Sequence, residues 1–537
     1  MLRRTAALVA LALAAFAALA SPALARTIDV ANTADSGAGS LRATLAAAVS
    51  GDVVHVPAGT YVLSSGALSI PAGVTVAGDG ARGTIVSGGG VSGVFTTAGA
   101  GVVVQDLTVT AGRAAAGAGI HTNFGLVLHR AAITSNIATS NGGGIDNEGP
   151  QPLLIDHSLI ASNQAPNGTA GGVDVDGTST TSAIVASTIA GNSASSAAGG
   201  VYVDEAPALL DGDTFFGNSL SGVGGQGGNF RVHADSVTLR NTVLAGGVAT
   251  AGGDCYLSGG STLVSLGYNA EDTDRTPDSD CMNDLRGPGD RTGLALQLGA
   301  LQDNGGPTDT LLPAAGSPLV DAGNTANCSA TDQRGVPRPQ GAACDIGAVE
   351  RTTAAIGTAF AGAVTGTSAT LHATADTIGL GGSARFAYGP TTGYGAFTAT
   401  LGLPVAAGAQ GLSATLTGLL PGTTYHYRLL VTTPDGAVTG ADSAFKTTTR
   451  SPPPVCKVPK LTNLSLSHAG RALAKAHCKL GKVTYPRARR GARARRAGLV
   501  VRKQSRRAGA RFPDGAHVNV TLGPKPKPKP KKRHARG

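Results

Sequence analysis

From residue 141 onward the chain repeats a glycine-rich turn at a fixed interval, and this repeat limits the possible folds more than any other feature of the sequence. The residues that follow the turns are spaced by 28 positions: Ile145, Val173, Val201 and Asn229. A second marker recurs in phase with the first, an asparagine three residues after an apolar side chain: Asn136, Asn163, Asn192 and Asn218. A period of about 20 to 50 residues indicates stacked units, because one unit alone cannot bury its apolar side.

Between these turns lie short runs of aliphatic and β-branched residues, such as 153–155, 183–185 and 236–239. Each run is too short for a helix and is bounded by Gly, Asn, Asp or Ser, which is typical of strands. We expect three such strands and their turns to fill one rung, with equivalent residues about 4.8 Å apart along the stack. The sequence therefore predicts a parallel β-helix.

The repeated asparagine and glycine residues fit a structural role in such a stack. A buried amide can donate to one neighbour and accept from the other, so equivalent asparagines can form a ladder. Glycine permits a positive φ or a close approach of two backbones at each corner. We therefore interpret both sets as structural residues and not as ligand-binding residues.

The first 25 residues have the features of a secretory signal. An arginine pair precedes an apolar run at 6–20, and the small-residue motif at 23–25 predicts cleavage before Arg26. The apolar run is too short to span a bilayer, and no later segment is long and apolar enough to do so. We therefore expect a secreted protein, extracellular or associated with the cell wall, without a transmembrane segment.

Six cysteines suit an oxidising compartment. They fall into three pairs that are close in sequence: Cys255 with Cys281, Cys328 with Cys344, and Cys456 with Cys478. Six cysteines allow about 15 pairings, so proximity is the only ground for this expectation of three disulfides. No CxxC spacing or neighbouring histidine pair indicates a zinc site at these cysteines.

Charge is distributed unevenly along the chain. Residues 26–350 carry 29 acidic and 12 basic side chains, a net charge of −17, whereas 451–537 carry 24 basic and one acidic, a net charge of +23. Such asymmetry predicts a basic arm that holds an anionic surface while the acidic body projects from it. Nucleic acid is not the expected partner, because no nucleic-acid-binding motif accompanies the basic residues.

A cap is expected before the first rungs, because an open β-stack exposes an apolar end and unpaired strand edges. The segment 39–49 predicts a short helix with Ser40 as its N-cap. Leu41, Leu45 and Val49 would share the apolar side of this helix.

Motifs at both ends of the predicted β-helix resemble one known family. The N-terminal motifs are 40–42, 51–55 and 57–61, and those at the other end are 301–308, 316–323, 332–335 and 344–350. Together they resemble the secreted right-handed β-helix proteins of the pectate-lyase-like superfamily, of the choice-of-anchor Q domain type. The resemblance implies a right-handed parallel β-helix over 26–350 and a surface or secreted role without a defined activity.

From 354 to 449 the pattern changes to alternating strands of a single β-sandwich. The turn at 420–425 resembles the tyrosine corner of fibronectin type III domains, with Tyr425 tying the turn to the strand. The chain contains no tryptophan, so Phe386 or Tyr388 would fill the centre of this core. We expect this sandwich to act as a spacer.

A proline-rich linker at 450–456 leads to one predicted helix and three strands at 457–523. This order resembles a PASTA domain, which implies a small α+β fold facing peptidoglycan. The Lys/Pro-rich tail at 524–537 cannot form a helix and should stay extended. The residues expected to bind an anionic surface are Arg489, Arg490, Arg495, Arg496, Lys525, Lys527 and Lys529.

Candidate catalytic and metal-binding residues are few. Asp156 and His157 are the catalytic candidates, although a single Asp-His pair on a repeat is more often part of a turn. Asp174, Asp176 and Asp204 could offer the closely spaced oxygen ligands that Ca²⁺ requires, but solvated acidic loops are the more common explanation for such residues. No cofactor is expected.

The sequence thus predicts a mainly β protein: a right-handed parallel β-helix, a fibronectin type III-like sandwich and a small PASTA-like α+β domain. Its expected function is adhesion or carbohydrate binding at the cell surface or cell wall, with a wall polymer, peptidoglycan or an anionic glycan, as partner. The alternative is a polysaccharide lyase or glycoside hydrolase that acts on the β-helix surface. The glycan and the oligomeric state stay open.

Overall fold

A computed structural model describes residues 26–177, 179–222, 224–272, 284–406, 408–449, 453–486 and 498–526. The predicted signal peptide, Cys281 and most of the basic tail lie outside these residues. The described chain is mainly β, a parallel solenoid followed by antiparallel sheets, which confirms the predicted fold class. One compact unit holds the solenoid and most of the sandwich strands, and a second holds 446 onward with two short pieces of the sandwich.

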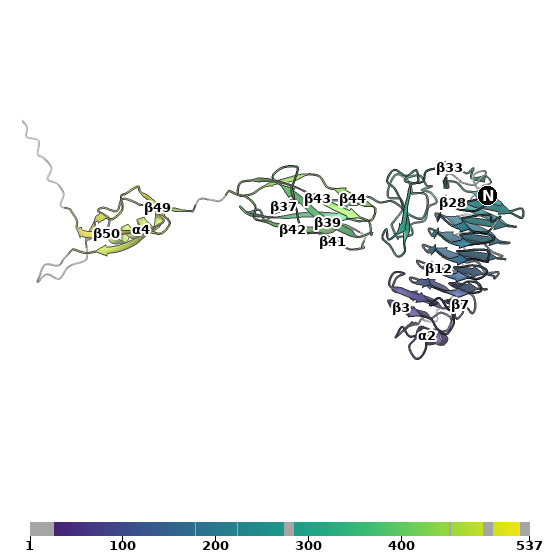
Figure 1. Cartoon of the computed structure of the whole chain (residues 1–537). Helices are drawn as coiled ribbons and strands as arrows, with labels where there is room; N and C mark the ends of the chain where they lie inside the picture. Colours follow the sequence, from purple (N-terminus) through teal and green to yellow (C-terminus); the bar gives the residue numbers. More distant parts are fainter. Residues whose placement is uncertain are drawn as a thin grey trace, which may run out of the picture. The chain divides into compact units, whose positions relative to one another are not determined.

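The solenoid consists of parallel sheets whose strands stack rung on rung (Figure 1). Sheet 1 contains β1 (Thr27–Asp29), β2 (Val53–Val56), β5 (Thr75–Gly78), β8 (Val103–Gln105), β12 (Leu126–His129), β16 (Leu153–Asp156), β20 (Ser182–Val185), β24 (Ala208–Asp211), β28 (Ser236–Arg240) and β31 (Thr262–Ser265). Sheet 2 contains β3 (Gly59–Val62), β6 (Thr84–Ser87), β9 (Thr108–Thr110), β13 (Ala132–Thr134), β17 (Leu159–Ala161), β21 (Thr188–Ala190), β25 (Thr214–Phe216), β29 (Val243–Ala245), β32 (Ala270–Asp272) and β33 (Arg291–Leu294).

Two further sheets complete each rung. Sheet 3 contains β10 (Arg113–Ala114), β14 (Ile137–Ala138), β18 (Gln164–Ala165), β22 (Ser193–Ala194) and β26 (Ser219–Leu220). Sheet 4 contains β4 (Leu68–Ile70), β7 (Phe95–Thr97), β11 (Ile120–Thr122), β15 (Ile145–Asn147), β19 (Val173–Asp176), β23 (Val201–Asp204), β27 (Phe230–His233) and β30 (Cys255–Ser258). The central rungs therefore have four strands, and the prediction of three was wrong, because the two-residue strands of sheet 3 are too short to leave an alternating pattern.

The register in sheet 4 confirms the 28-residue step for three rungs and corrects the fourth. Ile145 pairs with Val173 and Val173 with Val201, but Val201 pairs with Phe230 and not with Asn229. The side chains in this column are buried and form part of the solenoid core. Asn229 occupies the place that glycine holds in the earlier turns.

The predicted asparagine ladder is present in the solenoid interior. The side-chain amide of Asn136 donates to the side-chain oxygen of Asn163 at 2.9 Å, and Asn163 donates in the same way to Asn192 at 3.0 Å. The ladder continues through Asn192 and Asn218 and then passes to Asn229, whose oxygen accepts from Asn218 at 2.8 Å. These amides are fully buried, so each hydrogen bond offsets a desolvation cost.

Close backbone approach explains the glycines beside this ladder. A Cβ on Gly144 would lie 2.7 Å from the carbonyl oxygen of Gly172 and 3.0 Å from the Asn163 side chain. Only the first glycine of this turn, Gly142, has a positive φ, at 54°. The interpretation of the Gly and Asn residues as structural is therefore consistent with their contacts.

A short helix caps the N-terminal end of the stack, as predicted (Figure 1). Helix α2 (Leu41–Ala47) begins after Ser40, whose side chain accepts from the Ala43 amide at 3.2 Å. Leu41 and Leu45 are buried against the first rungs. Val49 lies beyond the end of the helix and is 63% exposed, so its predicted place on the apolar side was wrong.

The segment after the last rung lies against the outside of sheet 2 and runs back toward the early rungs. It contains the antiparallel pair β34 (Leu298–Gln302) and β35 (Thr310–Pro313). Arg82 forms ion pairs with Asp303 at 2.9 Å and with Asp309 at 2.7 Å. This closing segment, residues 296–352, also contains the Cys328–Cys344 disulfide, which confirms the second predicted pair.

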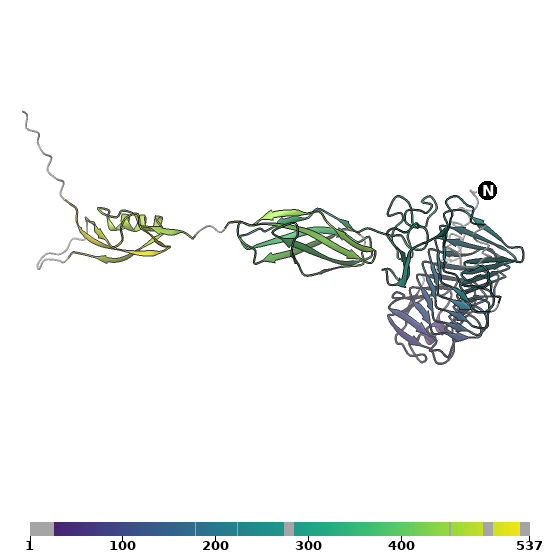
Figure 2. The ribbon, with the colours of Figure 1, turned by 45° about the horizontal axis from the view of Figure 1, so that its top comes forward.

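An antiparallel sandwich follows (Figure 2). Its strands are β36 (Ala355–Ile356), β37 (Phe360–Gly362), β38 (Ser368–Asp376), β39 (Gly382–Gly389), β40 (Ala396–Phe397), β41 (Leu401–Leu403), β42 (Gln410–Thr417), β43 (Thr424–Thr433), β44 (Gly436–Thr439) and β45 (Ser443–Lys446). Phe386 and Tyr427 are among its most buried large side chains, whereas Tyr388 is half-buried. Of the two predicted candidates, Phe386 thus fills the core.

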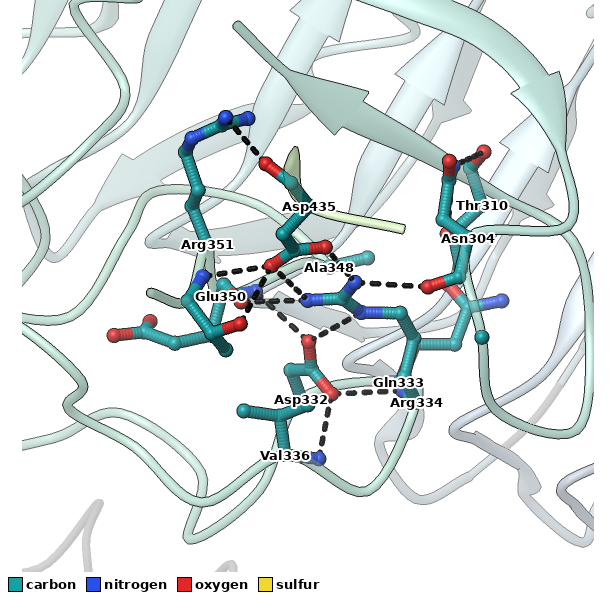
Figure 3. Close-up of polar contacts among 12 residues, drawn as sticks. Asn304, Thr310, Asp332, Gln333, Arg334, Val336, Ala348, Glu350, Arg351 and Asp435 are labelled. Atoms are coloured by element: carbon teal, nitrogen blue, oxygen red, sulfur yellow. Dashed lines mark hydrogen bonds and ion pairs between the residues drawn. The ribbon is translucent and has the colours of Figure 1, made fainter. Parts of the chain in front are cut away.

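The closing segment and the β43–β44 turn share a buried ionic cluster (Figure 3). Arg334 contacts Asp435 through Nη1 at 2.6 Å and Asp332 through Nε at 3.0 Å. It also donates to the backbone oxygens of Asn304 at 3.0 Å and Glu350 at 2.6 Å. The three charged side chains are fully buried, and every nitrogen of the Arg334 guanidinium has a partner.

The second unit contains a three-stranded sheet packed against one helix. The sheet order is β47 (Cys478–Thr484), β50 (Ala516–Pro524) and β48 (Leu499–Gln504), and the helix is α4 (Leu466–Lys475). Ser465 caps α4, and the Cys456–Cys478 disulfide confirms the third predicted pair. One pairing was not predicted, between β46 (Val455–Lys457) and β49 (Arg511–Pro513). None of the helices in the described parts of the chain is long and apolar enough to cross a bilayer.

Candidate functional site on the solenoid surface

The outward side of sheet 4 carries a column of polar and aromatic side chains. Strand residues alternate between the core and the surface, and in-register stacking places equivalent surface residues one above another. The paired residues of this first column are His121, Asp146, Asp174, Tyr202, Arg231 and Tyr256. Two residues along each strand a second column contains Asp176, Asp204 and His233. The structure therefore brings the three calcium candidates Asp174, Asp176 and Asp204 onto one surface.

Hydrogen bonds organise the ends of these columns. Nδ1 of His121 lies 2.9 Å from an Asp146 carboxylate oxygen, and Nδ1 of His233 lies 2.6 Å from Asp204. The Tyr202 hydroxyl donates to the other Asp204 oxygen at 3.0 Å. Asp204 is thus held from two sides.

The centre of the surface is poorly neutralised. Burial raises the pKa of Asp174 to about 8, against an opposing hydrogen bond from Thr169, and repulsion from neighbouring carboxylates adds to the increase. Burial and the charges of Asp204 and Glu205 raise the pKa of Asp176. The charge of Asp146 raises the pKa of Glu148.

An arginine lies between two tyrosine rings at the other end of the first column. The guanidinium carbon of Arg231 is 5.7 Å from the ring centroid of Tyr202 and 5.7 Å from that of Tyr256. Both distances fall within the range of cation–π contacts. Arg231 also donates to the Ser258 hydroxyl at 3.2 Å, so the three side chains are held in one stack.

These columns combine carboxylates, imidazoles, aromatic rings and one fixed cation over successive rungs. Carboxylates accept hydrogen bonds from hydroxyl or ammonium groups, and the tyrosines offer flat apolar surface beside a polar tip. Asp146, Tyr202 and Arg231 were not among the site residues predicted from the sequence. The 28-residue step leads from Asp146 to Asp174 and Tyr202, so it contained the signal for two of them.

Asp156 and His157 lie on a different side of the solenoid, at the edge of sheet 1. The structure adds His129 from the rung before: its Nδ1 lies 2.7 Å from one Asp156 oxygen, while Nδ1 of His157 contacts the other. Burial opposes ionisation of Asp156, but hydrogen bonds from both imidazoles hold its pKa well below the usual range. His129, which precedes His157 by 28 residues, was not among the site residues predicted from the sequence.

Three groups surround this histidine-aspartate cluster. The Thr331 hydroxyl, from the closing segment, lies 3.0 Å from Nε2 of His157. Arg130 contacts His129 and is paired with Asp106 through Nε at 2.7 Å and Nη2 at 2.6 Å. A carboxylate that stays ionised is not a proton donor, so Asp156 can serve as a ligand or as an orienting group.

The other predicted site residues lie apart from these two surfaces. Lys525 is exposed beyond the last strand of the second unit. Arg489, Arg490, Arg495, Arg496, Lys527 and Lys529 lie outside the described residues. Cys281 does as well, so its pairing with Cys255 stays a prediction.

No protein-family profile and no curated protein matches this chain. Among solved structures, the sensor domain of the anti-sigma factor RsgI4 from Pseudobacteroides cellulosolvens is similar at 22% sequence identity. The match covers 19% of this chain and 99% of that chain, with a TM-score of 0.16. A TM-score this low supports no conclusion about fold or function.

Proposed function

We propose that this chain is a secreted, cell-surface or cell-wall-associated carbohydrate-binding protein. The outward side of sheet 4 would bind the glycan, and the basic C-terminal region would hold the protein at the envelope. The observation that carries the proposal is the pair of in-register columns on sheet 4, in which acceptor and aromatic side chains recur on successive rungs.

A repeating surface suits a repeating ligand. Equivalent groups on neighbouring rungs lie about 4.8 Å apart, so an extended polymer can meet the same kind of group several times. The uncompensated carboxylates would repel a polyanion and attract hydroxyl or ammonium donors. We therefore propose a neutral or amino-bearing glycan as the ligand, rather than a uronate polymer.

Charge supports the anchoring role of the second unit. In the ranges 453–486 and 498–526 the second unit has one acidic side chain, Asp514. Its carboxylate forms an ion pair with Nδ1 of His477 at 3.6 Å, and none with a lysine or arginine of these ranges. The exposed members are Lys457, Lys460, Arg471, Lys475, Lys479, Lys482, Arg502, Lys503, Arg507, Arg511 and Lys525. An anionic wall polymer is the partner that this surface suits best.

The resemblances support the same assignment. Choice-of-anchor Q, fibronectin type III-like and PASTA-like domains would correspond to a display rod, a spacer and a wall-binding module. The signal-like N-terminus and the Cys328–Cys344 and Cys456–Cys478 disulfides suit an oxidising environment outside the cell.

A glycan array probed with the chain from Arg26 onward tests the sheet 4 site. We expect binding to neutral or amino-bearing glycans, and the double variant Asp176→Asn/Asp204→Asn should lose at least tenfold in affinity. Asp303→Asn/Asp309→Asn changes the net charge equally at the other side of the solenoid and should bind as the parent does. Equal loss in both double variants would contradict a defined site on sheet 4.

Two charge-reversed variants of the full chain test the anchor. Lys479 and Lys503 pair with the exposed His517 and Thr521 on the outer side of the sheet, whereas Arg471 and Lys475 lie on α4. We expect Lys479→Glu/Lys503→Glu to weaken binding to isolated cell walls more than Arg471→Glu/Lys475→Glu. Retention of both variants on the walls would contradict anchoring by this surface.

One observation favours a polysaccharide-cleaving enzyme as the second candidate. Asp174, with its pKa raised to about 8, lies among other carboxylates, and a protonated acid beside ionised carboxylates is the pairing that glycoside hydrolysis uses. Incubating the purified chain with the glycans that it binds decides between the candidates. Release of reducing ends or of unsaturated products, abolished in Asp174→Asn, would establish the enzyme.

A further inference from the structure

We propose that His129, Asp156 and His157 form a binding site for a divalent first-row transition metal, with Zn²⁺ as the reference ion. The site lies at the edge of sheet 1 and is independent of the glycan site proposed on sheet 4. Its three residues come from two neighbouring rungs, because His129 ends β12 and pairs with Asp156 at the end of β16.

The geometry brings three suitable ligand atoms together. One ligand atom from each residue lies within 4.8 Å of the others. Nδ1 of His129 and Nδ1 of His157 both point at the Asp156 carboxylate, and the two rings meet edge to face at an interplanar angle of 69°. All three side chains are about three-quarters buried or more, so their positions are constrained by the fold.

The donor set selects the class of ion. Two imidazoles with one carboxylate suit Zn²⁺, Fe²⁺, Cu²⁺ or Ni²⁺, whereas Ca²⁺ and Mg²⁺ take oxygen ligands. Three protein ligands leave the remaining positions to water or to a ligand atom, which is typical of functional rather than structural zinc sites. Local charge also favours a cation, because Asp106 neutralises Arg130 and leaves the charge of Asp156 for the metal.

Neighbouring residues favour metal binding by the His157 ring and oppose it at the His129 ring. Nε2 of His157 can donate its proton to the Thr331 hydroxyl at 3.0 Å, which leaves the Nδ1 lone pair for the metal. On His129 the guanidinium of Arg130 lies against Nε2. A metal on Nδ1 leaves a proton on Nε2, so Nε2 of His129 and Nη1 of Arg130, both donors, must move apart before His129 can bind.

Isothermal titration of Zn²⁺ into the metal-free chain from Arg26 onward, with Co²⁺ absorption as a second readout, tests the site. We expect one ion per chain, and a loss of at least tenfold in affinity in His157→Gln and in Asp156→Asn. Arg130→Gln should bind more tightly than the parent, because it removes the group that opposes His129.

Two histidines provide matched controls. His55 is on the same sheet, and its two ring nitrogens lie at 2.7 and 2.8 Å from Asp29 and Asp79, so it offers one imidazole and no second histidine. His426 lies on the sandwich, with its Nδ1 2.8 Å from Asp442. His55→Gln and His426→Gln should keep the parent affinity and the Co²⁺ spectrum. Absence of binding by the parent, parent-like binding in His157→Gln, or loss in His426→Gln would overturn the proposal.

Discussion

The Arg334 cluster and the outward side of sheet 4 are both rich in charged side chains, but the charges are paired in the first and largely unpaired in the second. At Arg334 one cation is matched by Asp332 and Asp435, and all three side chains are fully buried and hydrogen-bonded (Figure 3). On sheet 4 the carboxylates of Asp174 and Asp176 face other carboxylates, and the pKa of each is raised. The first arrangement is complete within the chain, whereas the second is not.

This difference separates structural charge from charge that can serve a ligand. A buried ion pair tolerates its loss of hydration only when every polar atom has a partner, and the Arg334 cluster meets this condition. Repelling carboxylates cost stability, and a fold gains nothing from keeping them together. Their presence on one surface is therefore the feature that most favours binding of an external group there.

The largest effect is expected from Arg334→Ala. The substitution leaves two buried carboxylates without their cation, and losing one partner of a buried pair costs about 3–5 kcal/mol. Chemical denaturation of the full chain, followed by the fluorescence of a probe on the sandwich, measures the loss. A change below about 1 kcal/mol would show that the cluster is not the buried network described above.

The next effect concerns Asp174 and is a dependence on pH. The folded state holds the Asp174 proton up to about pH 8, whereas the unfolded chain releases it near 3.8, so stability falls as the pH rises between these values. Asp174→Asn should remove this part of the pH profile. At pH 8 the free energy of unfolding of the variant, measured by chemical denaturation, should exceed that of the parent by more than about 1.4 kcal/mol, the equivalent of one pKa unit.

Asp35 provides the opposite control for Asp174. Burial by itself would raise the pKa of Asp35, but hydrogen bonds from Arg42, Ser64 and Ser65 hold this pKa well below its usual range. Ionised Asp35 therefore stabilises the folded state at pH values above 3.8, the pKa in the unfolded chain, and this stabilisation is lost as the pH falls below that value. Asp35→Asn should destabilise the protein at neutral pH, and an increase in stability would contradict the assigned shift.

A smaller effect on stability, with a larger effect on binding, is expected from Arg231→Gln. Loss of the contacts with Tyr202 and Tyr256 should cost about 0.5–1 kcal/mol of stability. Glycan binding should fall by more than this cost predicts, because both rings lose their fixed position. Unchanged binding in the array would separate the tyrosine stack from the proposed site.

The smallest effect is expected from Arg82→Ala, which removes exposed ion pairs with Asp303 and Asp309. The Arg82 side chain is 41% exposed, and exposed pairs contribute at most about 1 kcal/mol. The loss in chemical denaturation should therefore stay below that value and shrink further in high salt. A loss as large as that of Arg334→Ala would contradict the distinction between buried and exposed pairs.

Much of the solenoid could be predicted because it is built from local repetition. The step from Ile145 to Val173 and the recurring asparagines follow directly from the order of residues, and stacking in register turns each period into a spatial contact. The same step was sufficient to place Asp174 beside Asp146, whereas at the edge of sheet 1 the step is 27 residues and pairs His129 with Asp156. The step failed at Asn229, because Val201 pairs with Phe230 and not with Asn229. Asn229 instead continues the asparagine ladder, where its side-chain oxygen accepts from Asn218.

By itself the sequence determined the period, the apolar columns, the asparagine ladder and the separation of acidic and basic regions, because these depend on neighbours one repeat apart. Only the tertiary structure decided what the closing segment touches. Thr331 reaches His157 over 174 positions, and Arg334 reaches Asp435 over 101. A periodic pattern cannot predict such contacts, because they depend on how a non-repeating segment packs against the side of the stack and against the sandwich. The energy of burying each charge also depends on its partner, which only the tertiary structure identifies.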